Sequence, residues 1–407
     1  MTDGSPRHIA FFQKAMGGGG AERMVAMLAS GLAARGHRVD LVLGQPRGPM
    51  LEHVSPSVRV VDLAAHCARL GVPALLRLPG SIRELAPRLL LKGRPRVLAC
   101  LRPLIDYLLR ERPEAMLSTV SFNGLVALWA REISGVPTRV VVREANTLSQ
   151  HVSGGKHEFR SLPRLIGEWY PKADAVVAVS DGVRDDLERS AKLKAGIAQT
   201  IHNGVDTERV EKLGAEPIEH PWLTAHRRTP VILSVGRLKP QKAYPTLLRA
   251  FAQLRRRRTV KLVILGEGKD REKLEALVEE LGLGKDVDLP GFASNPYPFM
   301  ARADLFVLAS NWEGFPNVLI EALAAGCSVV STDCPSGPRE VLAAGRYGRL
   351  VPIDDPNALA FGIEASLDAE PDAERARHRA RDFSIDHTIE RYLAALLPDE
   401  RRDKPPS

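Results

Sequence analysis

Short apolar runs alternate with longer amphipathic segments along this 407-residue chain. The runs are rich in Val, Ile, Leu and Phe, which is typical of strands buried on both faces of a parallel sheet. In the first half, strands are predicted at residues 8–12, 39–43, 58–63, 115–119, 139–143 and 174–180. In the second half, they are predicted at residues 231–236, 261–266, 287–291, 304–310, 328–333 and 348–353.

The segments between these strands have helical periodicity, clearest at residues 21–36, where Gly36 serves as a C-cap. Strand–helix alternation predicts an α/β protein with parallel sheets, in two consecutive doubly wound domains. Small ligands usually bind in a cleft between such domains. The expected boundaries are an N-terminal domain at 1–203, a linker at 204–229, a C-terminal domain at 230–380, a helix at 381–398 that packs back toward the N-terminal domain, and a disordered tail at 399–407.

The composition is that of an ordinary soluble globular protein, with 44% hydrophobic and 26% charged residues. No apolar run reaches the roughly 18 residues of a membrane-spanning helix, and residues 1–12 lack the apolar stretch of a signal peptide. The cysteines have the spacing of neither a disulfide framework nor a zinc site: Cys67, Cys100, Cys327 and Cys334. We therefore expect a reduced, cytoplasmic enzyme.

The net charge of +8 is concentrated in one stretch, because residues 69–112 hold ten basic and three acidic residues. Leu, Ile and Val recur between the arginines, as on a helix in the headgroup region of a membrane. We therefore expect residues 69–112 to dock on an anionic membrane surface, which implies a peripheral position on the cytoplasmic membrane. The alternative is that the apolar residues pack on the domain and the arginines are solvated. Nucleic acid is not expected, because Tyr107 is the only aromatic residue in this stretch.

Four glycines at residues 17–20 follow the first predicted strand and open the first helix. Glycine lets the backbone approach a ligand, and helix N-terminal amides favour anions. The run does not fit a dinucleotide fingerprint, because Arg23 occupies the third glycine position and Asp40 lies within a strand. A loop that contacts a phosphate or sugar is favoured over a flexible turn and over NAD binding.

Two cations, Arg237 and Lys242, follow the first strand of the second domain. Ligands bind at the carboxyl ends of such strands, and two cations on one turn suit a diphosphate. The alternative interpretation is a pair of solvated surface cations.

Residues 312–326 place Glu313 in a loop, Pro316 at a helix start and Glu321 within the helix. The two carboxylates could bind two ends of an extended ligand, and the amides of residues 314–317 suit phosphate or sugar oxygens. An exposed, purely structural Glu321 is disfavoured, because its neighbours are small and apolar.

The sequences GGGGAER (17–23), HNGVD (202–206), GRLKPQK (236–242), EGFPNVLIEA (313–322) and STDCPSGPREVL (331–342) together resemble glycosyltransferase family 4. The resemblance implies the GT-B fold, in which two Rossmann-like domains face a central cleft. It implies a retaining transferase that moves a hexose or N-acetylhexosamine from a UDP-sugar. It is strongest to bacterial enzymes that build envelope polysaccharides or lipid-linked oligosaccharides.

The resemblance also implies roles for individual residues. Arg237 and Lys242 would bind the donor diphosphate, Glu321 the ribose and Glu313 the transferred sugar, so that Arg237, Lys242 and Glu313 are the catalytic candidates. The donor site implied in full is Gly18, Gly19, Gly20, Gly236, Arg237, Lys242, Glu313, Gly314, Phe315, Pro316, Asn317, Val318 and Glu321. No cofactor and no metal are expected.

One position departs from the family. Many members carry a His after the strand that corresponds to residues 139–143, whereas this chain has Glu144 and Ala145 there. The polar candidates for the acceptor or sugar edge are Arg23, Glu144 and Asn146. His8, His151 and His202 are expected to be structural or at the surface.

The function expected from these residues is transfer of a sugar from a nucleotide sugar to a lipid-linked or polysaccharide acceptor. A non-hydrolysing UDP-sugar epimerase is an alternative with the same fold, but it lacks the pairing of GRLKPQK with EGFPNVLIEA. A catalytically inactive scaffold is a second alternative, which the intact Arg237, Lys242, Glu313 and Glu321 disfavour.

Overall fold

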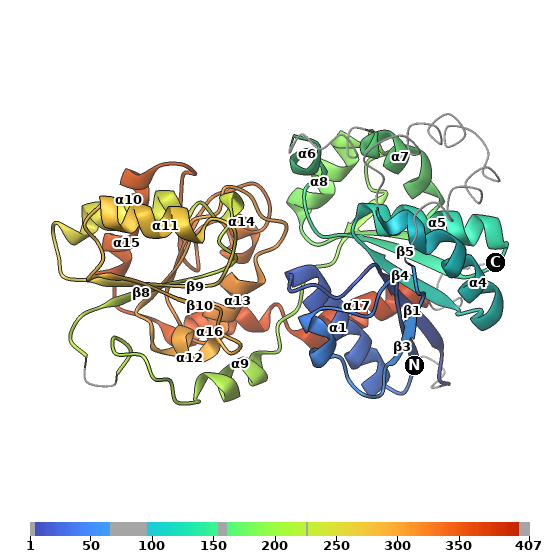
Figure 1. Cartoon of the computed structure of the whole chain (residues 1–407), viewed down its shortest axis with the longest axis horizontal. Helices are drawn as coiled ribbons and strands as arrows, with labels where there is room; N and C mark the ends of the chain where they lie inside the picture. The colour runs from blue at the N-terminus through green and yellow to red at the C-terminus, as the bar shows by residue number, and fades with distance from the viewer. Residues whose placement is uncertain (1–4, 66–95, 154–160, 225–226, 399–407) are drawn as a thin grey trace, which may run out of the picture. The chain divides into compact units, whose positions relative to one another are not determined.

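The computed structural model describes residues 5–65, 96–153, 161–224 and 227–398. The chain divides into two compact units. Unit 1 comprises residues 1–202 and 386–407, and unit 2 comprises residues 203–385. Figure 1 shows each unit as a sheet with helices on both of its faces.

Unit 1 is built on a seven-stranded parallel sheet with the order β3-β2-β1-β4-β5-β6-β7. The strands are β1 (His8–Gln13), β2 (Arg38–Leu43), β3 (Arg59–Asp62), β4 (Ala115–Thr119), β5 (Arg139–Glu144), β6 (Ala175–Ala178) and β7 (Ala198–Thr200). Each of the six predicted strands is present. The short β7 has only one fully buried residue, so no apolar run marks it in the sequence.

Helices cover both faces of the unit 1 sheet (Figure 1). They are α1 (Gly20–Ala34), α4 (Leu101–Glu111), α5 (Ser121–Ser134), α6 (Leu148–Ser153), α7 (Leu162–Trp169), α8 (Asp181–Ser190) and α17 (Ile385–Leu396), with short 3₁₀ segments η1 (Pro49–His53), η3 (Arg96–Cys100) and η5 (Tyr170–Lys172). The core on the α4, α5 and α7 side contains Trp129 and Trp169, whose rings meet edge to face. On the other side of the sheet, Gly31 allows α1 and α17 to pack closely. A Cβ added at Gly31 would lie only 2.3 Å from Ile389 Cδ1.

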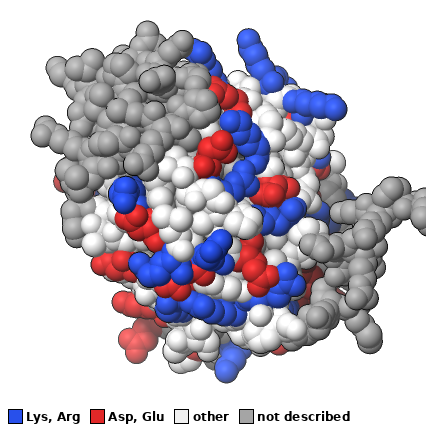
Figure 2. All heavy atoms as spheres, turned by 90° about the vertical axis from the view of Figure 1, so that its right-hand side faces the viewer, with Lys and Arg blue, Asp and Glu red and all other residues white. Residues whose placement is uncertain are grey.

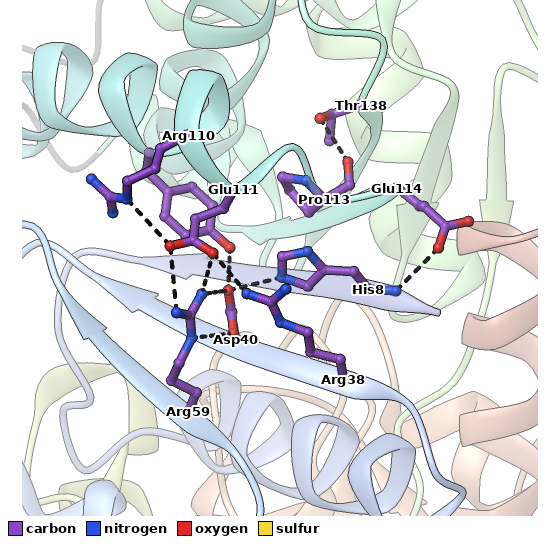
Figure 3. Close-up of polar contacts among 10 residues, drawn as sticks. His8, Arg38, Asp40, Arg59, Arg110, Glu111, Pro113, Glu114 and Thr138 are labelled. Carbon is purple, nitrogen blue, oxygen red and sulfur yellow. Dashed lines mark hydrogen bonds and ion pairs between the residues drawn. The ribbon is translucent and has the colours of Figure 1, made fainter. Parts of the chain in front are cut away.

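A buried carboxylate ties together the amino ends of β1, β2 and β3 (Figure 3). Asp40 is fully buried and accepts hydrogen bonds from Arg59 Nε at 2.8 Å and Tyr107 OH at 2.7 Å. His8 Nε2 lies 2.8 Å from Asp40 Oδ2. Burial alone would raise the pKa of Asp40, but these hydrogen bonds outweigh it and hold that pKa well below its usual range. His8 therefore has the structural role expected of it.

Unit 2 is built on a six-stranded parallel sheet with the order β10-β9-β8-β11-β12-β13. Its strands are β8 (Val231–Val235), β9 (Lys261–Leu265), β10 (Val287–Gly291), β11 (Leu305–Leu308), β12 (Val329–Thr332) and β13 (Arg349–Val351), all at predicted positions. Its helices are α9 (Thr207–Gly214), α10 (Tyr244–Arg255), α11 (Arg271–Glu280), α12 (Tyr297–Arg302), α13 (Asn317–Ala324), α14 (Pro338–Val341), α15 (Pro356–Leu367) and α16 (Ala373–Arg381), with the 3₁₀ turn η6 (Pro240–Lys242).

Residues 204–229, expected as a linker, instead form part of unit 2 where they are described. They contain α9, whose buried Val210 faces the unit and whose N-cap Asp206 accepts from Arg209 N–H. Asn295 Nδ2 donates to Leu213 O at 3.1 Å, which fastens α9 to the loop before α12. The helix is only eight residues long, so the sequence shows too few turns to reveal its period.

The predicted helix at 381–398 corresponds to α17, which lies in unit 1 and bonds there to β5. Tyr392 OH accepts from Arg143 Nε at 2.8 Å, and Ala395 O accepts from Arg139 Nε at 3.1 Å. The expected disordered tail, residues 399–407, lies outside the described residues, as do residues 66–95 of the basic stretch. Within the described chain, no helix combines the length and the apolar character needed to cross a membrane.

Candidate functional site

The turn after β8 is held tightly against the end of β9. Gly236 N–H donates to Leu265 O, and Leu238 N–H donates to Glu267 O, both at 2.9 Å. Gly266 has φ +143°, and a Cβ there would lie 2.0 Å from Gly236 O, so only glycine fits. This pairing fixes the backbone on both sides of Arg237 and leaves its side chain exposed at the carboxyl edge of the sheet.

Lys242 and Glu313, which the sequence assigned separately to a ligand, contact one another. Lys242 Nζ lies 2.7 Å from Glu313 Oε1, and the two side chains are 14% and 9% exposed. Ser310 Oγ donates to the same carboxylate oxygen at 2.6 Å. The loops that carry the pair are joined by Gln241, whose Nε2 donates to Trp312 O at 2.8 Å. The pair is therefore part of a fixed framework between η6 and α13.

A third cation, which the sequence reasoning missed, lies beside this pair. The pKa of Lys239 is lowered by burial and by the positive charges of Lys242 and Arg237. Burial is the larger cause, and the two neighbouring cations add to it. We call Arg237, Lys239 and Lys242 the cationic turn. Its positive potential suits an anion with two or more charges, such as a diphosphate.

The start of α13 lies in the same unit and has no side-chain cap. Phe315 is 7% exposed, and its ring meets that of Phe383 with centroids 5.5 Å apart. Asn317 Oδ1 accepts from Asn203 Nδ2 at 2.8 Å, which ties the HNGVD segment to this helix start. Asn203 was not singled out in the sequence, although its motif was. Gly314 and Pro316 are buried, Val318 is half-buried and Glu321 is only 5% exposed.

The glycine run of unit 1 occupies the loop between β1 and α1, as expected. Gly19 is the N-cap of α1 and has no side-chain cap, while Gly18 and Gly20 are exposed. A Cβ added at Gly20 would meet nothing within 4 Å, so the fold itself does not require glycine there. Arg23 lies in the first turn of α1. Asp40 lies toward the amino end of β2, away from the glycine run, and is bonded to Arg59. It therefore cannot serve as the ribose acid of a dinucleotide site.

At the end of β5, Glu144 points into the core rather than toward solvent. It is 2% exposed, and it accepts hydrogen bonds from Tyr170 OH and, at 2.9 Å, from Ser121 Oγ. Burial raises the pKa of Glu144 to about 7, against the effect of these donors. Asn146 is half-buried in the following loop.

Two further polar residues at this carboxyl edge were missed in the sequence. Asn123 Nδ2 donates to Gln13 Oε1 at 2.8 Å, and both side chains are buried. Gln13 Nε2 is buried and has no hydrogen-bond partner among the residues that the structure describes. A buried amide without a hydrogen-bond partner indicates a place where a polar group of a ligand could bind.

One Asp-x-Asp sequence, Asp286 to Asp288, lies at the start of β10, but both carboxylates are already paired. Asp286 contacts Lys261 and Arg255 at 2.9 and 2.7 Å, and Asp288 contacts His220 at 3.0 Å. Among the described residues, no cluster of three or more His, Cys, Asp or Glu could hold a metal ion.

Two family models together match most of the chain. Residues 18–209 match the model described as Glycosyltransferase Family 4, and residues 219–383 match that described as glycosyl transferases group 1. The boundary between the matches lies close to the division between units 1 and 2.

Several curated relatives are bacterial glycosyltransferases. The chain is 40% identical over 245 residues to the N-acetylgalactosamine-N,N'-diacetylbacillosaminyl-diphospho-undecaprenol 4-alpha-N-acetylgalactosaminyltransferase of Campylobacter jejuni. That match covers 60% of this chain and 64% of the relative, which is less than two thirds of its length. The chain is 26% identical to the lipopolysaccharide core biosynthesis glycosyltransferase LpsE of Rhizobium meliloti, over 85% of each chain.

Solved structures match the whole architecture. Anabaena HepE in complex with UDP and glucose superposes with a TM-score of 0.71 at 20% identity, over 95% of this chain and 98% of that one. The lipopolysaccharide outer core galactosyltransferase WaaB superposes with a TM-score of 0.68 at 20% identity, over the same shares. At this identity the likeness establishes the fold. The first half of this chain matches family 4 and its second half matches group 1. The chain belongs to the glycosyltransferases of the GT-B fold, as its parallel sheets, its motifs and both family matches show.

Proposed function

We propose that this protein transfers a hexose or N-acetylhexosamine from a UDP-sugar, with retention, to a hydroxyl of a growing lipid-linked envelope glycan. The observation that carries the proposal is the cationic turn at the carboxyl edge of β8, with Glu313 bonded to Lys242 at 2.7 Å. The Campylobacter jejuni relative, by its name, acts on a diphospho-undecaprenol-linked sugar, and HepE was crystallised with UDP.

In this proposal the cationic turn stabilises the leaving diphosphate. The bond between the sugar C1 and the diphosphate oxygen breaks, and the acceptor oxygen forms the new bond to C1 on the same face. The acceptor proton passes to the departing phosphate oxygen. Arg237 is exposed and free to make a bidentate contact, while Lys242 acts as a point charge. These cations then supply the charge neutralisation that metal-dependent transferases obtain from a divalent ion, which is why we expect no metal requirement.

The remaining donor contacts in this proposal are those that the family resemblance implies. Glu321 would bind the ribose hydroxyls, and Glu313 with the amides of residues 314–317 would bind the transferred sugar. Gly18, Gly19 and Gly20 of unit 1 would contact the phosphates or the acceptor. Near the acceptor, Asn146 and Arg23 remain candidates, whereas the bonds of Glu144 to Tyr170 and Ser121 favour a positioning role for that carboxylate.

The proposal is tested by incubating the full chain with a panel of UDP-sugars, in the presence of EDTA, and measuring release of UDP with and without lipid-diphosphate glycan acceptors. We expect one sugar to be released slowly to water and rapidly to an acceptor. An epimerase would instead convert the UDP-sugar without acceptor dependence, and a scaffold would release no UDP.

We further propose that residues 69–112 hold the protein on an anionic membrane surface, close to a lipid-linked acceptor. In the part of this stretch that the structure describes, Arg96 is exposed and Leu109 is 53% exposed. Arg102 and Arg110 pair with Asp106 and Glu111. On the face shown in Figure 2, Lys and Arg lie interspersed with Asp and Glu. Most of the net charge proposed for docking belongs to residues 69–95, which hold six of the ten basic residues and only one of the three acidic ones.

The docking proposal is tested by flotation with vesicles that contain anionic lipid, at low and high salt. Changing Arg88, Lys92 and Arg94 to Glu should abolish flotation, since each cation near the surface contributes about 1 kcal/mol. Equal flotation of both proteins, or binding indifferent to salt, would contradict it.

A further inference from the structure

Unit 1 contains a small basic pocket at the carboxyl edge of β1 and β2. Its volume is about 280 Å³, and its lining residues are Lys14, Gly44, Gln45, Arg47, Ala65, Arg96, Ala99 and Cys100. Three of these are cations, and the described lining includes no carboxylate. We call this the basic pocket. Pockets for drug-sized ligands usually start at roughly 300 Å³, so its size suits one compact group rather than a whole nucleotide sugar.

The wall between β1 and β2 is fixed by backbone hydrogen bonds. Gly44 N–H donates to Gln13 O, Gln45 N–H to Lys14 O and Met16 N–H to Arg47 O, each at 3.0 Å. These bonds place the backbones of Lys14 and Arg47 side by side. The backbones from which these two cations extend are therefore fixed before an anion binds.

The floor of the basic pocket is closed by Gly44 and Cys100. A Cβ at Gly44 would lie 2.5 Å from Cys100 Sγ and 3.1 Å from Lys14 O, so a larger residue would not fit. Ala65 N–H donates to Gly44 O at 2.9 Å and closes a second side. Burial raises the pKa of the Cys100 thiol to about 12, although Lys14 lowers it, so the thiol is neutral at pH 7. The floor therefore adds no negative charge.

The arginines of the basic pocket differ from others in unit 1. Arg59, Arg131 and Arg184 each form ion pairs with carboxylates. Arg47 and Arg96 are exposed, and within the described chain neither forms an ion pair with a carboxylate. The acid at the end of β3, Asp62, accepts a hydrogen bond from Ala64 N–H at 2.7 Å and does not line the pocket.

We propose that the basic pocket binds the diphosphate that joins the acceptor glycan to its lipid. The inference rests on the proposed function, because it assigns this group to the second substrate. The donor diphosphate already has the cationic turn of unit 2, so a separate cation set in unit 1 serves a different phosphorylated group. Arg47 and Arg96 would form charge-assisted hydrogen bonds to the phosphoryl oxygens, with Lys14 behind them.

The test measures binding of farnesyl diphosphate to the full chain by titration calorimetry, with saturating UDP present to fill the donor site. Farnesyl monophosphate, farnesol, inorganic pyrophosphate and inorganic phosphate are titrated in parallel. We expect farnesyl diphosphate to bind more tightly than each of these, with a Kd that rises with salt. The double variant Arg47→Gln/Arg96→Gln should raise that Kd by about tenfold or more. The variant Arg47→Lys/Arg96→Lys should retain much of the affinity.

The matched control is Arg189→Gln/Lys194→Gln. It removes two exposed cations near β7, the edge strand of the same sheet, away from β1 and β2. It should leave the Kd for farnesyl diphosphate unchanged. Since all four side chains are exposed, urea denaturation midpoints should agree among the proteins.

Three results would overturn the assignment. These are an equal Kd for the wild type and the Arg47→Gln/Arg96→Gln variant, equal losses in the control variant, and inorganic phosphate binding as tightly as farnesyl diphosphate. The last would assign the basic pocket to free phosphate. Turnover of UDP-sugars without binding of farnesyl diphosphate would remove the pocket proposal alone. Binding that depends on Arg47 and Arg96, without turnover of any UDP-sugar, would remove the proposed function alone.

Discussion

Removing Lys242 should damage both stability and turnover, whereas removing Arg237 should damage turnover alone. Lys242 and Glu313 are 14% and 9% exposed, so Lys242→Ala leaves a buried carboxylate that still accepts a hydrogen bond from Ser310 but has lost its cation. Breaking such a pair costs about 3–5 kcal/mol. Arg237 is exposed, so Arg237→Ala should change the free energy of unfolding by less than about 0.5 kcal/mol.

Both substitutions should lower turnover by about 10²–10³, because each removes one preorganised group that stabilises the leaving diphosphate. The assays are urea denaturation and UDP release from the preferred UDP-sugar. The double variant Lys242→Ala/Glu313→Gln removes the uncompensated charge, so it should regain at least about half of the lost stability but none of the activity.

Two outcomes would refute this reasoning. If Lys242→Ala unfolds at the same urea concentration as the wild type, the pair does not hold the loop before α13. If either single variant turns over at the wild-type rate, that cation does not bind the leaving group.

Further predictions concern three carboxylates. Glu321→Ala should raise KM for the UDP-sugar with kcat nearly unchanged, because ribose hydroxyls gain no charge during transfer; a constant KM with a collapsed kcat would give Glu321 a chemical role. Asp40→Asn should cost about 3 kcal/mol at pH 7, measured by urea denaturation. Because the folded pKa of Asp40 is depressed, its contribution is present above the unfolded pKa of about 4 and is lost as pH falls below it, so the two proteins should converge in acid. Glu144 has a folded pKa raised to about 7, so the wild type should lose stability as pH rises from about 4.5 to 7, by on the order of 3 kcal/mol, and Glu144→Gln should abolish that slope.

Local pattern was enough to predict most of the fold. The buried strands of both sheets are apolar runs, so their periodicity and the alternation with helices specify two parallel sheets. The sequence missed β7, with three residues, and α9, with eight, because neither is long enough to show a period. The misplaced linker at 204–229 has the same cause.

The candidate site was predicted as separate motifs, and the contacts among them were not. Lys242 and Glu313 are 71 residues apart, so only the topology of β8 and β11 shows that they pair. Lys239 carries no signal in the sequence, because its burial beside Arg237 and Lys242 depends on how the turn folds. The basic pocket joins Lys14, Arg47 and Arg96, which are far apart in the sequence and were not part of any motif identified there.

The most direct test of the account is the comparison of UDP with uridine as ligands, by calorimetric titration of the wild type and Arg237→Ala. Only UDP carries the diphosphate, so its extra affinity measures what the cationic turn contributes. We predict that the wild type binds UDP at least about 100-fold more tightly than uridine, since each charge-assisted hydrogen bond contributes about 1.5–3 kcal/mol. Arg237→Ala should narrow that ratio by about tenfold or more and leave uridine binding unchanged. Equal affinity of the wild type for UDP and uridine, or a ratio that Arg237→Ala does not alter, would contradict the diphosphate site on which the proposed transfer depends.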